Sequence, residues 1–322
     1  MKKINIGVLG CANIAKRYVL PAINDLEQYK LHGIASRSTC KAEEYAKIFK
    51  TKAFNGYNQI LDEDLDAVYI PLPNSLHYYW IKKSVNKNIH VLVEKSLACT
   101  LNEVVELNDL ARQKNVVLVE NFQFRFHCQL LFIKNLLESG RIGELRSIRS
   151  SFGFPPFRDK ENIRYQKDLG GGALLDAGAY TLKISQMFLG SEIYVDSASL
   201  EFSSDKNVDI WGSAFLKQKN GKLTSQVTFG FDNYYQNSIE IWGSNGKITA
   251  PRIFTAAPGF EPSIILESDG KIECIKLSPD DHFKKMLIYF YNLVHSKVGL
   301  DDEYMQNINQ ARLIEELFEK AQ

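Results

Sequence analysis

The chain has 322 residues, of which 45% are hydrophobic and 24% charged, the balance of a globular protein of about two domains. Lys and Arg total 39 against 38 Asp and Glu, so no net charge draws the chain to nucleic acid or to an anionic membrane. The five cysteines are scattered and odd in number, which indicates reduced thiols in a cytoplasmic protein and argues against a metal site such as zinc. No run reaches about 18 apolar residues, and Lys2-Lys3 leads directly into a strand, so we expect neither a membrane span nor a signal peptide.

Short β-branched runs alternate with helical segments over the first 120 or so residues. The expected strands cover residues 4–9, 31–35, 66–70, 90–94 and 116–119. The expected helices cover 13–28, 41–49, a stretch that begins near Asn74 or Ser75, and 100–114, where Thr100 and Glu103 form a capping box. This alternation predicts an α/β protein whose residues 1–121 form a Rossmann dinucleotide-binding domain.

The pattern changes after residue 122, where strands and turns predominate. We expect a strand region from about residue 145 that includes 193–202, 209–218, 222–231, 238–242 and 264–277, with a helix over 172–188 that Gly190 ends. Asn220-Gly221 is a strong hairpin signal, and two helices, 281–296 and 302–320, close the chain. Residues 122–322 therefore form an expected α+β domain with a large open, mostly antiparallel sheet. One sheet face is free for a partner subunit, and the last helix can return to the first domain.

The first turn of the chain reads Gly10-Cys11-Ala12-Asn13-Ile14-Ala15. The dinucleotide-binding fingerprint has three glycines: the first forms the tight turn, the second lets the diphosphate approach, and the third lets the helix pack on the strand. Gly10, Ala12 and Ala15 occupy these three positions here. Ala12 adds a methyl group where the diphosphate approaches, so the motif alone also fits a simple packing turn. A strand before the turn and a helix N-terminus after it favour cofactor binding.

Ser36-Arg37-Ser38 follows the second strand, at the place where NAD-binding proteins carry an acidic residue for the ribose. A guanidinium between two hydroxyls suits the 2′-phosphate of NADP(H) instead. The alternative is an arginine that is merely solvated.

Lys95 follows a buried strand at the sheet edge where ligands bind in this class of fold. Beside a nicotinamide, its ammonium would donate a proton or stabilise a carbonyl that is being reduced; a solvated strand-end charge is the alternative. Asp176 and Tyr180 share a helix face after Gly170-Gly171-Gly172, glycines that allow backbone to pass close to a ligand. A free Tyr titrates near ~10, and a neighbouring Lys lowers that pKa, so Tyr180 with Lys95 would make a matched acid. Without Lys95, Tyr180 reads as core packing.

Four segments in this order resemble the Gfo/Idh/MocA oxidoreductase family: the first turn, Glu94-Lys95, the run from Gly170 to Tyr180, and Gly243-Ser-Asn-Gly246. The resemblance covers essentially the whole chain. Within the family, Lys16-Arg17-Tyr-Val-Leu-Pro21-Ala22, Glu120-Asn121-Phe122 and Ile163-Arg164-Tyr165-Gln166 resemble nucleotide-diphosphate-hexose 3-ketoreductases.

The resemblance implies a role for individual residues. Lys95 would contact the nicotinamide ribose and the substrate, Tyr180 would donate the proton, and Asp176 would position the sugar. The expected cofactor-binding residues are Gly10, Cys11, Ala12, Asn13, Ile14, Ser36, Arg37, Leu72, Asn74, His77, Glu94, Lys95 and Asn121, although His77 fits a packing role equally well. The expected substrate-binding residues are Arg164, Tyr165, Asp176 and Arg252, and further cations, Arg158, Lys160 and Lys167, lie near Arg164. Ser96 stands where the family has Pro, which leaves the geometry of that turn open.

The expected function is the NADPH-dependent reduction of a keto group on a nucleotide-linked keto-deoxyhexose by a homodimer or homotetramer that associates through its C-terminal sheet. One alternative is an NAD(P)-dependent reductase or dehydrogenase of a free sugar, an anhydro-sugar or a diol. Another is a nonenzymatic NADP-sensing regulator, against which the presence of both Lys95 and Tyr180 weighs.

Overall fold

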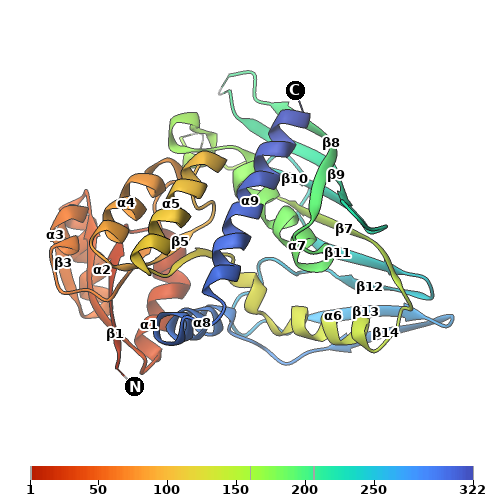
Figure 1. Cartoon of the computed structure of the whole chain (residues 1–322), viewed down its shortest axis with the longest axis horizontal. Coiled ribbons are helices and arrows are strands. Elements are labelled where there is room, and N and C mark those ends of the chain that lie inside the picture. Colours follow the sequence, from red (N-terminus) through yellow and green to blue (C-terminus); the bar gives the residue numbers. More distant parts are fainter. Residues whose placement is uncertain (1, 160, 206, 322) are drawn as a thin grey trace. The chain divides into compact units, whose positions relative to one another are not determined.

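The computed structural model describes residues 2–159, 161–205 and 207–321, so Lys160 lies outside the described residues (Figure 1). The chain forms two compact units. Unit 1 consists of Met1–Phe122 and Phe283–Ile308, and unit 2 of Gln123–His282 and Asn309–Gln322. The predicted second domain, 122–322, is therefore interrupted by a segment that belongs to unit 1. That segment is held there by Phe283, whose ring stacks on Tyr18 at 4.8 Å between centroids, and by the buried Tyr29 hydroxyl, which donates to the Leu287 carbonyl at 2.6 Å.

Unit 1 is built on a six-stranded sheet in which every pair of neighbours is parallel. The strand order β3-β2-β1-β4-β5-β6 confirms the Rossmann topology. Its central strands are largely apolar because helices cover both faces, as Val91, Leu92 and Val93 of β5 illustrate with no exposed surface. The strands are β1 (Ile4–Leu9), β2 (Tyr29–Ser36), β3 (Lys52–Asn55), β4 (Ala67–Ile70), β5 (His90–Glu94) and β6 (Leu118–Asn121).

The helices of unit 1 largely follow the predicted ones, with one clear difference at the start. The expected helix over 13–28 contains a π-helical turn, after which Pro21 has no N–H to continue the regular bonding, and it ends at Asp25. The capping box is confirmed: Thr100 Oγ1 accepts from Glu103 N at 3.2 Å, and the Glu103 carboxylate accepts from Thr100 N. The elements are η1 (Ala15–Val19), α1 (Leu20–Asp25), α2 (Thr39–Phe49), α3 (Tyr57–Leu61), α4 (Asn74–Asn86), α5 (Leu101–Lys114), α8 (His282–Ser296) and the first part of α9 (Leu300–Lys320).

Unit 2 contains an eight-stranded sheet in the order β14-β13-β12-β11-β7-β10-β9-β8. All neighbours are antiparallel except β10 and β7, which run parallel, so the predicted mostly antiparallel sheet is confirmed. The expected strand over 264–277 is a hairpin, because Asp269 and Gly270 adopt φ of 53° and 73° and turn the chain. The strands are β7 (Leu145–Gly153), β8 (Ile193–Phe202), β9 (Asp209–Gln218), β10 (Thr224–Gly230), β11 (Gln236–Gly243), β12 (Gly246–Ala250), β13 (Ser263–Ser268) and β14 (Lys271–Lys276).

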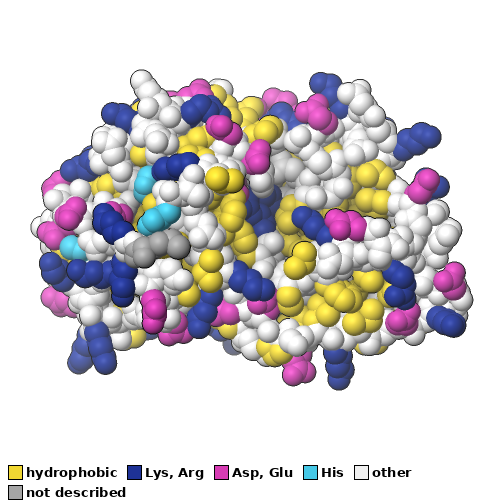
Figure 2. Space-filling model, turned by 60° about the horizontal axis from the view of Figure 1, so that its bottom comes forward, with side chains coloured by type: hydrophobic (Ala, Val, Ile, Leu, Met, Phe, Trp, Pro, Cys, Tyr) yellow, Lys and Arg dark blue, Asp and Glu magenta, His cyan; other side chains and the backbone are white. Residues whose placement is uncertain are grey.

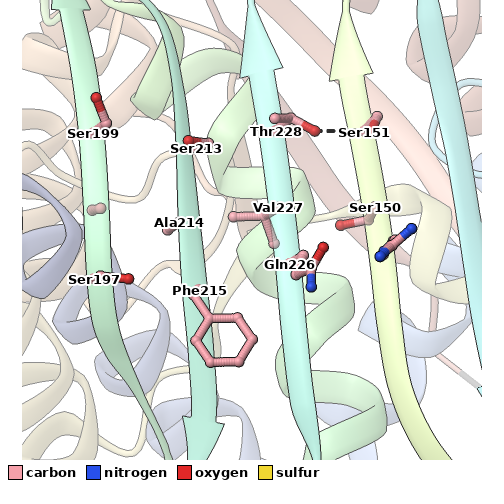
Figure 3. Close-up of a pocket in the computed structure, with 12 residues that line it drawn as sticks. Ser150, Ser151, Ser197, Ser199, Ser213, Ala214, Phe215, Gln226, Val227 and Thr228 are labelled. Carbon is pink, nitrogen blue, oxygen red and sulfur yellow. Dashed lines mark hydrogen bonds between the residues drawn. The ribbon is translucent and has the colours of Figure 1, made fainter.

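One face of this sheet is covered by helices, and the other is open. The π-helical turn η5 (Leu174–Gly178) and the helix α7 (Ala179–Leu189), which ends at Gly190 as predicted, pack on β7, β9 and β10. On the other face, Figure 3 shows a row of short side chains, Ser199, Ser213, Thr228 and Ser151, across β8, β9, β10 and β7, with the larger Phe215 and Gln226 in the next row. The remaining helical elements of unit 2 are η2 (Gln123–Phe126), α6 (Cys128–Glu138), η3 (Ile163–Tyr165), η4 (Lys167–Leu169) and the end of α9.

The surface charge agrees with the near-neutral composition. In the view of Figure 2, Lys and Arg side chains are interspersed with Asp and Glu, and neither sign collects into one large patch. Within the described residues, no helix has both the length and the apolarity needed to cross a membrane.

Candidate cofactor and catalytic sites

The turn after β1 has the backbone geometry of a phosphate-binding turn. Gly10 adopts φ of +125°, and a Cβ at this position would lie 2.9 Å from Leu72 Cδ2 and 3.1 Å from the Pro71 carbonyl oxygen. Only glycine fits such a position. Cys11 and Ala12 follow, half-buried, and the helical conformation begins at Asn13. Gly10 N donates to the Ala35 carbonyl at 2.9 Å, and the helix that starts at Asn13 has its N-terminus at the carboxyl edge of the sheet.

The end of β2 presents one exposed cation. Arg37 is exposed and lies beside Tyr57, whose pKa is raised by burial and lowered to a smaller extent by the charge of Arg37. The buried Ser36 accepts from Ser38 N at 3.1 Å, and Ser38 in turn caps α2 by accepting from Lys41 N at 3.4 Å. The two serines therefore shape the turn that holds Arg37 at the sheet edge.

Lys95 is held by a hydrogen-bonded turn after β5. The preceding carboxyl, Glu94, accepts from the Tyr69 hydroxyl at 2.6 Å and from Asn121 Nδ2 at 2.8 Å, and burial raises the pKa of Glu94. The Lys95–Ser96 peptide bond is cis. Ser96 N donates to Asn74 Oδ1 at 3.1 Å. Glu94, Asn74 and Asn121 thus support the lysine from its own unit.

His77 lies beneath this turn and has no exposed surface. Its Nδ1 is 2.7 Å from the Ser96 carbonyl oxygen and its Nε2 is 2.8 Å from that of Leu72. Burial lowers the pKa of His77 to about 4, and hydrogen bonding to the two carbonyl oxygens opposes this shift. His77 joins the turns after β4 and β5, and any effect on a cofactor acts through Leu72 and Ser96.

The start of the Tyr180 helix is fixed by a buried carboxyl that the sequence did not suggest. Asp209, at the beginning of β9, accepts from Leu174 N at 2.5 Å, and burial raises the pKa of Asp209 to about 6. Gly172 has φ of +114°, and a Cβ there would lie 2.2 Å from Asp209 Oδ1. The glycine run was expected to allow a ligand close to the backbone; at Gly172 it makes room for the chain's own carboxylate.

Tyr180 lies in the first turn of α7 with 7% of its surface exposed. Its ring packs against three phenylalanines, with centroid distances of 5.6 Å to Phe124, 5.2 Å to Phe152 and 5.9 Å to Phe254. Gln123 Nε2 donates to the Tyr180 hydroxyl oxygen at 3.5 Å. The phenol is therefore nearly buried, in largely apolar surroundings.

Asp176 and Arg164 form an ion pair next to this tyrosine. Arg164 Nε donates to Asp176 Oδ2 at 2.6 Å, and the guanidinium lies over the Phe157 ring, 4.9 Å from its centroid. The charge of Asp176 raises the pKa of Arg164, and Tyr180 and Tyr165 add smaller effects in the same direction. The sequence predicted Asp176 and Arg164 as separate contacts to sugar and diphosphate; the structure brings them together.

The remaining predicted cations have other surroundings. Arg252 follows β12 and is exposed, with its guanidinium 5.2 Å from the Phe260 ring centroid and 6.0 Å from that of Tyr235. Arg158 and Lys167 are exposed. The Tyr165 hydroxyl oxygen accepts a hydrogen bond from Phe157 N at 3.1 Å.

Three side chains of kinds that can bind a metal ion lie together at the N-terminus of α6. Ligand atoms of His127, Cys128 and Asp280 all lie within 4.8 Å of one another. His127 Nδ1 accepts from Gln129 N at 3.2 Å, and Asp280 Oδ2 accepts from Cys128 N at 2.7 Å. These bonds satisfy amides that the helix itself leaves unpaired, so we assign the group to helix capping.

Comparison with known proteins identifies the family. A model described as an oxidoreductase family with an NAD-binding Rossmann fold matches residues 4–122, and a model of the GFO/IDH/MocA C-terminal domain matches residues 130–249. The chain belongs to the Gfo/Idh/MocA oxidoreductase family. It is thus an oxidoreductase, in agreement with the resemblance seen in its sequence motifs.

Members of the Gfo/Idh/MocA family match this chain from end to end. The dTDP-3,4-didehydro-2,6-dideoxy-alpha-D-glucose 3-reductase of Saccharopolyspora spinosa is 38% identical over 98% of this chain and 96% of its own length. KijD10, a 3-ketoreductase from Actinomadura kijaniata solved with NADP and TDP-benzene, superposes with a TM-score of 0.95 at 35% identity, covering 99% of this chain and 98% of that one. Variants of KijD10 with a lysine replaced by alanine and a tyrosine by phenylalanine have also been solved. The D-xylose 1-dehydrogenase (NADP(+)) 2 of Haloferax volcanii is 29% identical over 98% of this chain and 97% of its own length.

Proposed function

We propose that this protein reduces, with NADPH, a keto group on a nucleotide-linked keto-deoxyhexose, with Tyr180 as proton donor and Lys95 as its electrostatic partner. The observation that carries the proposal is the end-to-end similarity to 3-reductases of dTDP-linked dideoxy sugars. This chain has both residue types, lysine and tyrosine, that were replaced in the solved variants of KijD10.

The residues of unit 1 fit NADP(H). The turn at Gly10 would hold the diphosphate, because it leads into the N-terminus of the helix that begins at Asn13. Arg37 is exposed at the end of β2, and Ser36 and Ser38 beside it carry no negative charge to repel a 2′-phosphate. When bound, NADPH supplies a hydride to the carbonyl carbon of the substrate. Asn121 Oδ1 is buried without a hydrogen-bond partner among the described residues, which supports a place for Asn121 beside a ligand.

The residues of unit 2 fit the second half of the reaction, the delivery of a proton. Tyr180 would protonate the carbonyl oxygen as negative charge develops on it. A cation stabilises the phenolate that remains, and Arg164 already exerts such an influence within unit 2. Lys95, whose turn is braced by Glu94 and Asn74, would supply the second cation.

The substrate class in this proposal is a deoxyhexose linked to a nucleoside diphosphate. Phe124, Phe152 and Phe254 are 0%, 7% and 0% exposed, so they fix the Tyr180 ring and leave its hydroxyl as the group that faces the sugar. Such a sugar offers few polar contacts of its own. Binding energy from the base and the diphosphate would then orient it, with Arg164, Tyr165 and Arg252 as the candidate contacts.

Calorimetry with a panel of nucleoside diphosphates on the NADP-bound protein tests this substrate class. We expect micromolar binding of one nucleotide, weakened by Arg164→Ala or Arg252→Ala. Arg146→Ala is the matched control, because Arg146 is a half-exposed arginine paired with Glu144 outside the proposed site. No binding of any nucleotide at millimolar concentration would overturn the proposal.

The second candidate is a reductase or dehydrogenase of a free sugar or diol, which the end-to-end relationship to D-xylose 1-dehydrogenase favours. Turnover of an unactivated sugar, with no nucleotide binding, would select it. The relatives named above are all enzymes, which favours either candidate over a nonenzymatic regulator.

We also propose that the open face of the unit 2 sheet joins two copies of the chain. A row of short side chains and the larger Phe215 and Gln226 line a shallow hollow of ≈ 550 Å³ on this face (Figure 3), and Trp211 and Trp242, 40% and 55% exposed, lie on the same face. Trp242 is paired with Ser147 on the neighbouring strand. Trp211 lies two residues before Ser213 in β9, so the two side chains point to the same face. An open face with a row of short polar side chains and exposed aromatic residues suits a second, identical face.

Sedimentation velocity tests this association. Ser213→Arg and Trp242→Glu should convert a dimer or tetramer into smaller species, while Tyr79→Glu, at an exposed aromatic residue of unit 1, should not. A monomeric wild-type protein would contradict the proposal.

A further inference from the structure

Gln123 is a buried polar residue that none of the roles above explains. It lies two residues after the end of β6, begins η2, and has 5% of its surface exposed. Its Nε2 donates to the hydroxyl oxygen of Tyr180 at 3.5 Å. Its Oε1 is buried and has no hydrogen-bond partner among the described residues.

An amide is costly at this position. Its neighbour Phe124 packs on the Tyr180 ring, which also contacts Phe152 and Phe254, and a buried carbonyl oxygen without a partner destabilises the folded state. A leucine or methionine would fill similar space without that loss. The bond to Tyr180 is the contact that distinguishes the amide from an apolar side chain of the same size.

We propose that Gln123 is a positioning residue that acts through Tyr180: its N–H holds the phenol oxygen, directs the phenol O–H away from itself toward the substrate, and stabilises the phenolate that proton transfer leaves behind. In that step, the O–H bond of Tyr180 breaks and the proton joins the substrate oxygen. The bonding electrons stay on the phenol oxygen, and the hydride that completes the reduction comes from NADPH, which becomes NADP⁺. This inference rests on the proposed role of Tyr180 as proton donor.

Other groups near Tyr180 carry charge and would set its titration together with Gln123. Within unit 2 these are Arg164 and its partner Asp176, with Tyr165 as a further titratable group. The phenylalanines packed on the ring are uncharged. In the proposed function, Lys95 is a further charged group that acts on Tyr180. Gln123 is the neutral hydrogen-bond donor of this group, so it can be replaced without changing the charge.

A double-mutant cycle with Tyr180→Phe tests the inference. We expect Gln123→Leu to lower kcat by about 10- to 100-fold, the effect of one hydrogen bond to a charged group. Because the acid must be protonated, kcat falls above the pKa of Tyr180. Loss of the donor should therefore move that alkaline limb to higher pH, and Gln123→Glu, which adds a carboxylate, should move it further. In the Tyr180→Phe background, Gln123→Leu should have no further effect on kcat.

Gln310→Leu is the matched control for burial. Gln310 is 1% exposed, donates one bond, to the Ala179 carbonyl at 2.8 Å, and its Oε1 also lacks a partner among the described residues. Its loss should change stability but leave the alkaline limb in place. Thermal unfolding and NADPH binding show whether the Gln123 variants fold, and Gln123→Met provides a second, closely shaped apolar variant.

The two proposals fail in different ways. If Tyr180→Phe alone retains full kcat, the proposed function fails and this inference falls with it. If Tyr180→Phe loses activity while the Gln123 variants leave the alkaline limb unmoved, or lower kcat equally in both backgrounds, the proposed function stands and Gln123 is only a structural residue.

Discussion

Replacing Gly172 by alanine should destabilise unit 2 at the helix that carries Tyr180. The positive φ of +114° places an alanine in a strained conformation, and its Cβ would lie 2.2 Å from Asp209 Oδ1. Backbone strain of this kind costs about 1–3 kcal/mol. Displacing the Asp209 carboxylate also removes a capping bond to Leu174, worth about 0.5–2 kcal/mol, so the expected total is about 1.5–5 kcal/mol.

Urea unfolding followed by circular dichroism measures this loss, and Gly140→Ala is its control. Gly140 also has positive φ, +72°, but nothing lies within 4 Å of a Cβ built there, so only strain of about 1–2 kcal/mol should appear. Gly172→Ala should also lower kcat at a temperature where the variant remains folded, with NADPH affinity unchanged. Equal destabilisation in the two variants would refute the close contact between Gly172 and Asp209.

Further predictions concern cofactor choice and pH. Arg37→Ala should lower kcat/KM for NADPH by about 10- to 100-fold and leave that for NADH nearly unchanged, because only the 2′-phosphate needs the guanidinium; equal effects on both cofactors would contradict this. Burial raises the pKa of Asp209 from 3.8 to about 6, so its protonated form favours folding: the stabilisation is complete below pH 3.8 and is lost as pH rises through 6. Asp209→Asn should therefore flatten the pH dependence of the urea midpoint over that range, and an unchanged slope would show that Asp209 does not cause it. Lys95→Ala should lower kcat and move the alkaline limb upward, and an unshifted limb would separate Lys95 from the titration of the acid.

Local sequence patterns were sufficient for much of unit 1. The capping box at Thr100 and Glu103 depends on four consecutive residues, and the parallel strands are buried apolar runs between helices. The short strand β3 was missed because Lys52–Asn55 is mostly exposed and carries no apolar pattern. The β13–β14 hairpin had a visible signal, Asp269-Gly270, inside a run that otherwise reads as one strand.

The site in unit 2 was harder to predict because its contacts join distant segments. Asp176 and Tyr180 share a helix and could be paired by spacing, but the ion pair of Asp176 with Arg164 depends on how the preceding loop folds. Asp209 reads as an ordinary strand start, and only the tertiary fold places it at Leu174. Gln123 belongs to no recognisable motif. Its hydrogen bond to Tyr180 joins residues that are 57 positions apart, so it forms only in the folded chain.

The central claim is that the protein reduces a nucleotide-linked keto sugar with Tyr180 as the acid. The most direct test is stopped-flow measurement of NADPH oxidation by the wild-type protein and by Tyr180→Phe, with the dTDP-linked 3,4-didehydro-2,6-dideoxyglucose for which the Saccharopolyspora spinosa relative is named. The account predicts stoichiometric NADPH oxidation by the wild type and a rate about 10²- to 10⁴-fold lower for Tyr180→Phe, with cofactor affinity unchanged. No oxidation by the wild type, or equal rates for the two proteins, would contradict it.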